Sequence, residues 1–423
     1  MKIKLKLNLQ HIITFLMFIN IIYYFIPITN SILNTNIMFL NNIGIFFLTF
    51  IDLKHVKMRN KSFVAIISLL ILEFIFYFVR RYYQNGIVGI YSILYIFNPI
   101  LVTIYLFERK EYQCIKFLAY TTLISLVFTS ITTFIGLKQY PDLARVLATI
   151  TDSQSSTLDY AKKNNIGGFD IVYSMVLAVP LYYYFINNNL KNNIIKLLLK
   201  IITFLLLLLF VIEAQYTTAL LLVCSITVIS IMIIKFNWKY IILLSLIFLL
   251  SFDVISIRLS KMVSNISDNI DSQVISLRLD ELASTLNSGK TSGQDISERS
   301  DAYEKSIDIF KENVVTGCWY NDEVYPGGHS TILDTLAMSG IVIFIVIIIC
   351  FYNIVGCLFF NITIEQVKKS QFLVLLTYLI FATLNPAFSG SFFSVLFITT
   401  IGISMDKYIQ KKLEDSYEGN MVM

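Results

Sequence analysis

Charged residues are scarce in this sequence, and their scarcity limits the class of protein. Asp, Glu, Lys and Arg make up 14% of the 423 residues, whereas 56% of the residues are hydrophobic. A soluble domain carries roughly 25% charged residues, and the mean hydropathy of this chain is +0.71. The composition therefore excludes a soluble globular protein and predicts an all-α, polytopic integral membrane protein.

Cysteine and histidine are also rare, with Cys 5 and His 3 in the whole chain. No CxxC pair and no Cys/His spacing typical of a metal site occurs. On the topology argued below, only Cys318 faces the outside, so it has no partner there for a disulfide. A Gly-rich phosphate-binding loop is absent too. We therefore expect no metal, no nucleotide-sugar donor and no cofactor.

Apolar runs long enough to cross a bilayer recur along the chain. A spanning helix needs about 20 predominantly apolar residues, and polar connectors divide the sequence into about twelve such runs. The last two runs are short and are separated by Asn385 and Pro386. The expected spans are 11–28, 32–51, 62–79, 87–107, 114–136, 170–187, 194–212, 214–234, 237–253, 332–360, 371–385 and 388–406.

The basic residues indicate which side of the membrane each connector faces. Alternate segments, starting with the N-terminus, hold most of the 33 lysines and arginines, whereas the short connectors on the other side hold only Arg80 and Arg81. Because short connectors rich in Lys and Arg stay in the cytoplasm, both termini are expected to be cytoplasmic. This asymmetry accounts for the net charge of +5, which therefore does not indicate a nucleic-acid partner.

Two long outer segments, 137–169 and 254–331, interrupt the series of short connectors. Within the second, apolar residues at helical spacing predict an amphipathic helix over 275–286, and a further helix is expected to begin at Ser297 or Ser300. The predicted organisation is spans one to five in 1–136, an outer loop in 137–169, spans six to nine in 170–253, a large outer loop in 254–331, spans ten to twelve in 332–406 and a cytoplasmic tail in 407–423.

Few outer side chains are suited to catalysis or to binding an anion. His329 follows the Pro326-Gly327-Gly328 turn at the expected mouth of the tenth span. Histidine exchanges a proton near neutral pH, as a general base must, although a structural role is the alternative. Arg80 and Arg81 are adjacent guanidiniums that suit a lipid headgroup or a diphosphate. Alternatively, the two arginines only place their charged ends at the membrane interface and bind no specific ligand.

The large outer loop also contains a recognisable series of residues. Arg299 is followed by Phe310-x-x-Asn313-x-x-x-Gly317, and then by Gly327-x-His329-Ser330-x-x-Leu333-Asp334, which leads through Gly340 into a span. This order, spacing and position resemble the motif of the O-antigen ligase and polymerase superfamily.

The earlier outer loop carries a second part of the resemblance. Its segments 141–148, which include Arg145, and 165–173, which include Gly167 and Gly168, are similar to those of capsule and O-antigen repeat-unit polymerases. Glycines there would let the backbone approach a ligand closely. The chain departs from the family at 213–219, where many members carry an arginine and this sequence has none.

The resemblance implies a membrane glycosyltransferase that joins oligosaccharide repeat units carried on polyprenyl diphosphate, at the outer face of a bacterial cytoplasmic membrane. It implies that His329 deprotonates or orients the acceptor hydroxyl, and that Arg299 and Arg145 bind the diphosphate, with Arg80 and Arg81 as further candidates. The other expected substrate-binding residues are Gly167, Gly168, Trp319, Tyr320, Tyr325, Gly328 and Ser330. The three aromatic residues among them could equally belong to an interfacial aromatic belt.

Partners and alternatives follow from the same resemblance. The expected partners are the lipid-linked oligosaccharide, membrane lipid, a flippase and a chain-length regulator. A ligase of the same superfamily, which transfers finished glycan to another acceptor, is one alternative. A repeat-unit flippase or other transporter is the second, although transporters usually place ionisable residues near the membrane midplane and often contain internal repeats.

Overall fold

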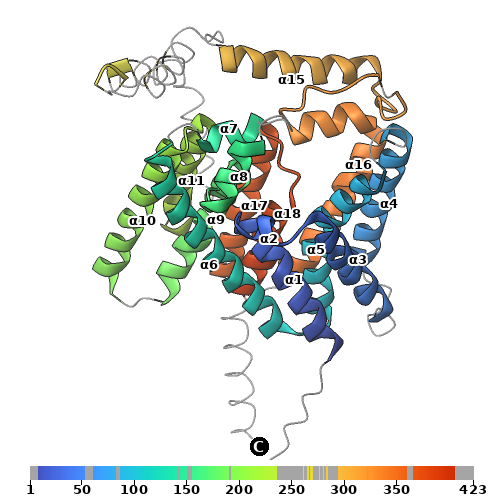
Figure 1. Cartoon of the computed structure of the whole chain (residues 1–423), viewed down its shortest axis with the longest axis horizontal. Helices are drawn as coiled ribbons and strands as arrows, with labels where there is room; N and C mark the ends of the chain where they lie inside the picture. Colours follow the sequence, from blue (N-terminus) through green and yellow to red (C-terminus); the bar gives the residue numbers. More distant parts are fainter. Residues whose placement is uncertain are drawn as a thin grey trace, which may run out of the picture.

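The computed structural model describes residues 8–52, 61–81, 86–140, 143–149, 155–189, 192–235, 294–321, 323–359 and 365–404, together with isolated residues between 261 and 283. Within these residues, every regular element is a helix, and the helices form a bundle crossed at one end by a single long helix (Figure 1). The expectation of an all-α membrane protein is therefore confirmed at this level.

Helices occupy every expected span except 237–253, which lies outside the described residues. In the part of the chain that the structure describes, six helices are long and apolar enough to cross a membrane, and shorter apolar helices accompany them. The bundle helices are α1 (Leu9–Phe25), α3 (Thr35–Ile51), α4 (Lys61–Arg81), α5 (Gly86–Glu108), α6 (Tyr112–Leu137), α9 (Phe169–Asn189), α10 (Asn193–Glu213), α11 (Thr217–Lys235), α16 (Thr331–Phe359), α17 (Glu365–Leu384), α18 (Gly390–Phe393) and η3 (Ser394–Thr399). A short helix, α2 (Thr29–Ile32), joins α1 to α3.

The segments expected on the outer side form shorter or surface-lying helices. The first outer loop contains α7 (Leu143–Thr149) and α8 (Ser155–Lys163). The second contains α15 (Gln294–Glu312), which lies across the end of the bundle and contacts α16 (Figure 1). The expected start of this helix at Ser297 or Ser300 is wrong, because α15 begins at Gln294.

The expected tenth span, 332–360, is not one straight helix. The backbone of Gly340 has φ 65° and ψ 175°, which breaks α16 into two helical parts. The part before Gly340 lies beneath α15, and the part after it descends beside α4 (Figure 1). The second part, about 19 residues long, measures about 28 Å, enough for the hydrocarbon core. The first part is therefore available to shape the outer surface.

Buried asparagines join the N-terminal helices α1, α3 and α5. Asn20 of α1 donates to Asn42 of α3 at 2.9 Å, and Asn41 of α3 donates back to Asn20 at 2.8 Å. Asn98 of α5 donates to the Asn42 side chain at 2.7 Å. Each of these side chains is at most 8% exposed. Polar side chains buried among apolar helices are stable only when they bond one another, so this network fixes how the three helices pack.

A proline inside α5 creates the contact that places α18. Pro99 has no N–H, so the carbonyl of Tyr95, four residues earlier, lacks its helical donor. The Tyr24 hydroxyl of α1 donates to this carbonyl at 2.7 Å. A Cβ at Gly390, the first residue of α18, would lie 2.6 Å from the same oxygen. Only glycine allows α18 to approach α5 so closely.

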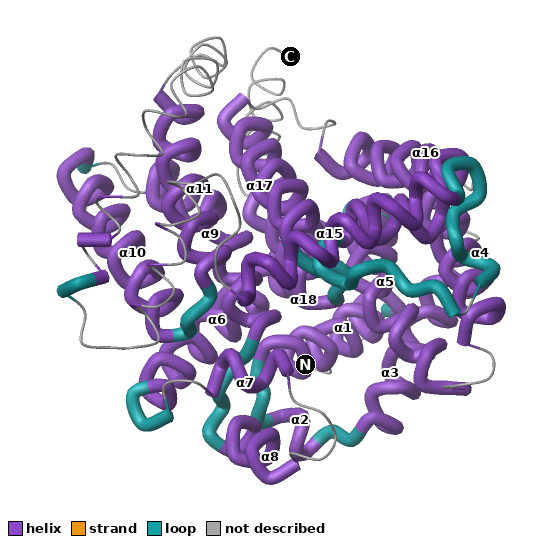
Figure 2. Tube along the Cα trace, turned by 90° about the horizontal axis from the view of Figure 1, so that it is seen from above, coloured by secondary structure: helices purple, strands orange, loops and turns teal. Residues whose placement is uncertain are grey.

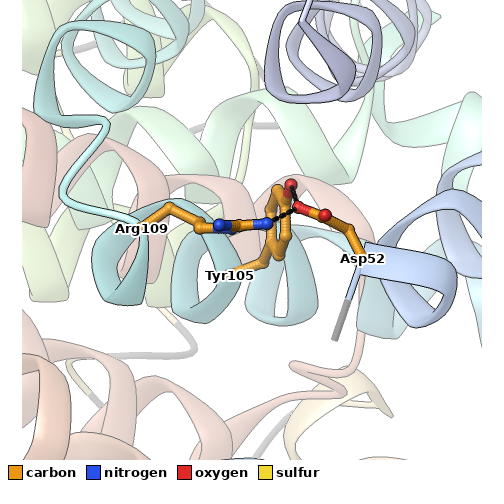
Figure 3. Close-up of polar contacts among 3 residues, drawn as sticks. All are labelled: Asp52, Tyr105 and Arg109. Carbon is orange, nitrogen blue, oxygen red and sulfur yellow. Dashed lines mark hydrogen bonds and ion pairs between the residues drawn. The ribbon is translucent and has the colours of Figure 1, made fainter. Parts of the chain in front are cut away.

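An ion pair joins the other ends of α3 and α5, on the side predicted to be cytoplasmic. Arg109 and the Tyr105 hydroxyl both bind the Oδ2 atom of Asp52 (Figure 3). The side chains of Arg109 and Asp52 are 22% and 12% exposed, so they are only partly screened by solvent. Viewed along the bundle, α1, α3 and α5 lie together on one side, and α9, α10 and α11 lie on another (Figure 2).

Candidate functional site

The glycines of the large outer loop hold α15 against the bend in α16. Gly317 has φ +72°, and a Cβ there would lie 2.2 Å from the Met338 carbonyl oxygen. A Cβ at Gly340 would lie 2.4 Å from the Gly317 nitrogen. Two backbone hydrogen bonds, Cys318 N to Ala337 O and Ile341 N to Val314 O, close the contact. The two motif glycines therefore have a structural role, because no other residue fits this backbone crossing.

A half-buried carboxylate, that of Asp334, fixes the turn that carries His329. Asp334 accepts from the Ser306 hydroxyl of α15 at 2.6 Å and from the Ser330 backbone N–H at 3.1 Å. Ser306 in turn accepts from the Gly327 N–H at 2.9 Å. A Cβ at Gly327 would lie 2.0 Å from the Ala302 carbonyl oxygen of α15. The turn is thus held against α15 on both sides of His329.

His329 itself is half-buried at the surface of this turn. Its neighbour Gly328 has φ +79° and meets no atom that would oppose a Cβ, so that glycine is required by its backbone conformation alone. Two residues after His329, the Thr331 N–H donates to the Asn385 carbonyl at 3.3 Å. Because the Thr331 hydroxyl also accepts from the Ala387 N–H at 2.5 Å, the His329 turn is fastened to the segment between α17 and α18.

Arg299 reaches the same segment from α15. Its Nη1 atom donates to the Thr218 hydroxyl at 3.0 Å and to the Asn385 Oδ1 atom at 3.4 Å. Both acceptors are neutral, and within the described residues Arg299 forms no ion pair. The Nδ2 atom of Asn385 is buried and has no hydrogen-bond partner. A half-buried guanidinium without a counter-charge is an electrostatically favourable place for an anion.

Tyr303, one turn after Arg299, fastens α15 to the end of α17. Its hydroxyl donates to the Leu384 carbonyl at 2.8 Å. Burial raises the pKa of Tyr303, and the nearby Asp334 charge raises it too, while Arg299 lowers it. The raised pKa keeps the hydroxyl protonated at physiological pH, so that it remains a donor to this carbonyl.

Arg145 is carried by α7 at the same end of the bundle. The Tyr216 hydroxyl donates at 2.8 Å to the carbonyl of Ala144, the residue before Arg145. Tyr216 precedes α11, and Thr218 of α11 contacts Arg299, so the α7 backbone lies beside the element that Arg299 contacts. The structure describes the backbone of Arg145 and not the position of its side chain.

Packing explains the two glycines after α8. The Gly167 N–H donates to the Thr133 hydroxyl at 2.8 Å, and a Cβ at Gly167 would lie 2.5 Å from Ile171. A Cβ at Gly168 would lie 3.1 Å from Leu147 of α7. Gly168 therefore allows α7 and α9 to approach each other, and Gly167 leaves room for the first turn of α9; neither role needs a ligand.

Of the remaining expected residues, Trp319 and Tyr320 lie at the other end of α15, and Tyr325 lies two residues before Gly327, which contacts Ser306. Trp319 packs against Phe76 of α4, with ring centroids 6.0 Å apart. Tyr320 and Tyr325 are 55% and 50% exposed, and the Tyr320 hydroxyl donates to Asn313 at 3.0 Å. From Arg299 to the end of α15, the rise of 1.5 Å per residue amounts to about 20 Å. The structure therefore divides the expected site into an Arg299 end and an aromatic end.

Arg80 and Arg81 belong to the aromatic end. They form the last turn of α4, one turn beyond Phe76, and their side chains lie outside what the structure describes. Ser330, by contrast, belongs to the His329 turn. It is buried, and its hydroxyl accepts from the Leu333 N–H at 3.2 Å, as a helix cap does.

Asp170 is a candidate that the sequence analysis did not select. Its Oδ2 atom accepts from the Ser389 hydroxyl at 2.7 Å and from the Ser391 hydroxyl at 3.1 Å. Ser389 lies four residues after Asn385, in the segment that the His329 turn and Arg299 contact. The available signal was a lone carboxylate at the start of an apolar run, because such a group is costly in a membrane and commonly functional.

Comparison with known proteins adds nothing to this geometry, because no family model and no curated protein matches the chain. Within the described part of the chain, no group of three or more His, Cys, Asp or Glu side chains could hold a metal ion. The arrangement offers a cation, a neutral amide, a histidine turn and a carboxylate along segment 385–391.

Proposed function

We propose that this protein is a membrane glycosyltransferase that polymerises polyprenyl-diphosphate-linked oligosaccharide repeat units at the outer face of a bacterial cytoplasmic membrane. The observation that carries the proposal is the position of Arg299. A guanidinium that contacts only neutral acceptors, close to the turn that carries His329, suits a diphosphate leaving group next to a base.

The proposed chemistry assigns one role to each group. The acceptor hydroxyl gives its proton to His329, and its oxygen attacks the anomeric carbon of the donor sugar. The bond from that carbon to the diphosphate oxygen breaks, and the diphosphate leaves with the bonding electrons. Arg299 stabilises the negative charge that develops on it, with Arg145 as the second cation. Such a reaction requires no metal and no nucleotide.

Segment 213–219 supports the assignment of Arg299. Many members of the superfamily that the sequence resembles carry an arginine there, and this chain has Thr218 instead. Because Thr218 accepts from Arg299 at 3.0 Å, the guanidinium of the large loop occupies the neighbourhood of that missing arginine. Arg145 then provides the second cation that those relatives have.

The membrane topology proposed with this function has twelve spans and two cytoplasmic termini. Every candidate residue from the large loop then lies on the outer side, where lipid-linked repeat units are polymerised. Arg80, Arg81, Trp319 and Tyr320 form a second outer group about 20 Å from Arg299 along α15. We propose that this group contacts the glycan or the lipid headgroup.

A ligase that transfers finished glycan would need the same groups, and the geometry around Arg299 does not separate the two activities. A transporter is disfavoured by the position of the polar groups, because α15, which carries Arg299, and the start of α16, which follows His329, lie at one end of the bundle and not at its middle (Figure 1).

The test is the lipid-linked intermediate that accumulates when the gene is deleted. A polymerase deletion should leave single repeat units on the outer leaflet, where an impermeant glycosidase or lectin can reach them. A ligase deletion should instead leave long polymers on the lipid, and a flippase deletion should leave single units on the inner leaflet. Either of the last two results would overturn the proposal.

A further inference from the structure

Asp170 contacts segment 385–391 near Ser389 and Ser391, whereas Arg299 contacts the same segment at Asn385. Its carboxylate is half-buried, whereas Ile171, Val172 and Tyr173, which follow it in α9, are at most 3% exposed. Ser389 and Ser391 both donate to one carboxylate oxygen, Oδ2. The other oxygen, Oδ1, accepts no hydrogen bond from any residue that the structure describes. An ionisable group in this position is retained only if it faces water or a polar ligand.

Arg299 and Asp170 carry opposite charges at the two ends of one short segment. Arg299 contacts Asn385, and Asp170 contacts Ser389. Four residues of chain span at most about 14 Å, which limits the distance between these two contact points. Within the described residues the two groups do not pair, and each is held by neutral partners instead. A substrate placed along the segment would meet a cation at one end and a carboxylate at the other.

A purely structural role does not account for this carboxylate. Thr331 already holds segment 385–391 through the Asn385 carbonyl and the Ala387 N–H. The close approach of Gly390 to the Tyr95 carbonyl fixes its far end. Where this protein needs only to join helices, as with Asn20 and Asn42, it uses neutral amides that bond one another. Helix packing does not require a charged carboxylate whose second oxygen accepts no hydrogen bond from the described residues.

We propose that Asp170, held by Ser389 and Ser391, is a subsite for the hydroxyl groups of a sugar in the lipid-linked repeat unit. A carboxylate accepts hydrogen bonds and donates none, and its bonds to O–H groups are among the stronger ones. Its charge repels a diphosphate and so directs that group toward Arg299. Phe169 and Phe388, each partly exposed and each preceding one of the bonded residues, present apolar surface to a sugar face. This inference rests on the proposed function and names the part of the substrate bound at this end.

Thiol labelling tests the subsite without relying on activity. Ser389→Cys would be introduced into the full-length protein, and intact cells would be treated with a membrane-impermeant maleimide. The probe is free repeat-unit oligosaccharide, released by mild acid from the lipid-linked repeat units of the host. We expect Ser389→Cys to be labelled, and the oligosaccharide to slow its labelling at least several-fold.

Two further cysteine variants serve as controls. Val315→Cys, at a site that is 61% exposed on the outer surface, should be labelled at a rate that the oligosaccharide does not change. Ser174→Cys, at a fully buried site one turn deeper in α9, should not be labelled. Adding Asp170→Asn to Ser389→Cys should preserve labelling and remove the protection. Absence of labelling at Ser389→Cys, or protection that survives Asp170→Asn, would overturn the subsite.

The outcome can be separated from that of the proposed function. Protection that depends on Asp170 in a protein that forms no polymer would retain the sugar subsite and reject the polymerase. A product ladder without protection would retain the polymerase and reject the subsite. In an active preparation, Asp170→Asn should raise KM for the lipid-linked substrate roughly tenfold or more, with a smaller change in kcat, because a hydrogen bond to a charged group is lost. An unchanged KM would also reject the subsite.

Discussion

Two polar regions of this protein differ in how completely their groups are paired. In the N-terminal bundle, Asn20, Asn41, Asn42 and Asn98 bond one another across α1, α3 and α5 and are almost fully buried. Around segment 385–391, Arg299 contacts only neutral acceptors, and the Nδ2 atom of Asn385 has no partner. The first region uses its hydrogen-bonding capacity to hold helices together. The second retains capacity that a substrate can use.

This difference separates stability from activity, and substitutions in the two regions should therefore have opposite effects. Changes beside segment 385–391 should reduce activity and leave the fold intact. Changes in the asparagine network should reduce stability and leave the activity of the folded protein intact. The following predictions are ordered from the largest expected effect to the smallest.

The largest effect is expected for His329→Ala. Removing a general base typically lowers the rate by about 10²- to 10⁴-fold, so chain extension should stop. Membrane insertion should persist, because Asp334, Ser306 and Gly327 hold the turn without the imidazole. Polymer length on gels and protein level in membranes would be measured together. His11→Ala, which changes an exposed histidine of α1, is the matched control and should retain normal polymer. Normal polymer from His329→Ala would show that His329 is not the general base.

Arg299→Lys should have the next largest effect. Lysine keeps the charge and loses the planar fork that binds phosphate oxygens bidentately, so kcat/KM should fall at least about tenfold. The thermal midpoint should change little, since Thr218 and Asn385 are neutral and leave no unpaired charge when the guanidinium is replaced. Lys311→Arg, at an exposed position further along α15, is the control for exchanging lysine and arginine on that helix. Wild-type kcat/KM in Arg299→Lys would argue against binding of a diphosphate there.

Asn42→Ala should lower stability and leave the activity of the folded protein intact, the opposite of what is expected for His329→Ala and Arg299→Lys. It leaves Asn20 and Asn98 without their shared partner, at a cost of about 1–3 kcal/mol in the free energy of unfolding. The measurement is the thermal midpoint of purified protein in detergent, followed by activity per folded molecule at a temperature below that midpoint. A variant with unchanged stability and lost activity would show that the asparagine network belongs to the site.

Tyr24→Phe should give the smallest of these effects. It removes the donor to the Tyr95 carbonyl, which lacks a helical donor because of Pro99, and such a bond between membrane helices contributes about 0.6 kcal/mol. The midpoint should fall slightly and the polymer should remain normal. A large loss of activity would mean that the close contact of Gly390 with Tyr24 and Tyr95 controls the geometry of Ser389 and Ser391.

The sequence allowed the helical fold to be predicted, because apolar runs report directly on spanning helices. The bend of α16 was not visible, since the residues on both sides of Gly340 form one continuous apolar run. The bend is caused by the close contact between the backbones of Gly340 and Gly317. The sequence alone does not show which glycines contact each other in the fold. The beginning of α15 was also misplaced, because Ser297 and Ser300 resemble caps when only their residue type is considered.

The site was predicted in part, for a related reason. His329 and Arg299 were selected by residue type and by their order in the chain. The partners of Arg299, Thr218 and Asn385, are separated from it by 81 and 86 residues, and no local pattern connects them. Asp170 could be recognised only after Ser389 and Ser391 were found beside it. Residue types thus indicated the chemistry, and tertiary contacts decided which groups meet.

The most direct test of the central claim is the product pattern of the purified, full-length protein reconstituted in liposomes with lipid-linked repeat units as the only substrate. The account predicts a ladder of products that differ by one repeat unit, formed by the wild-type protein and absent with His329→Ala. Unchanged single repeat units after incubation with the wild-type protein would contradict it.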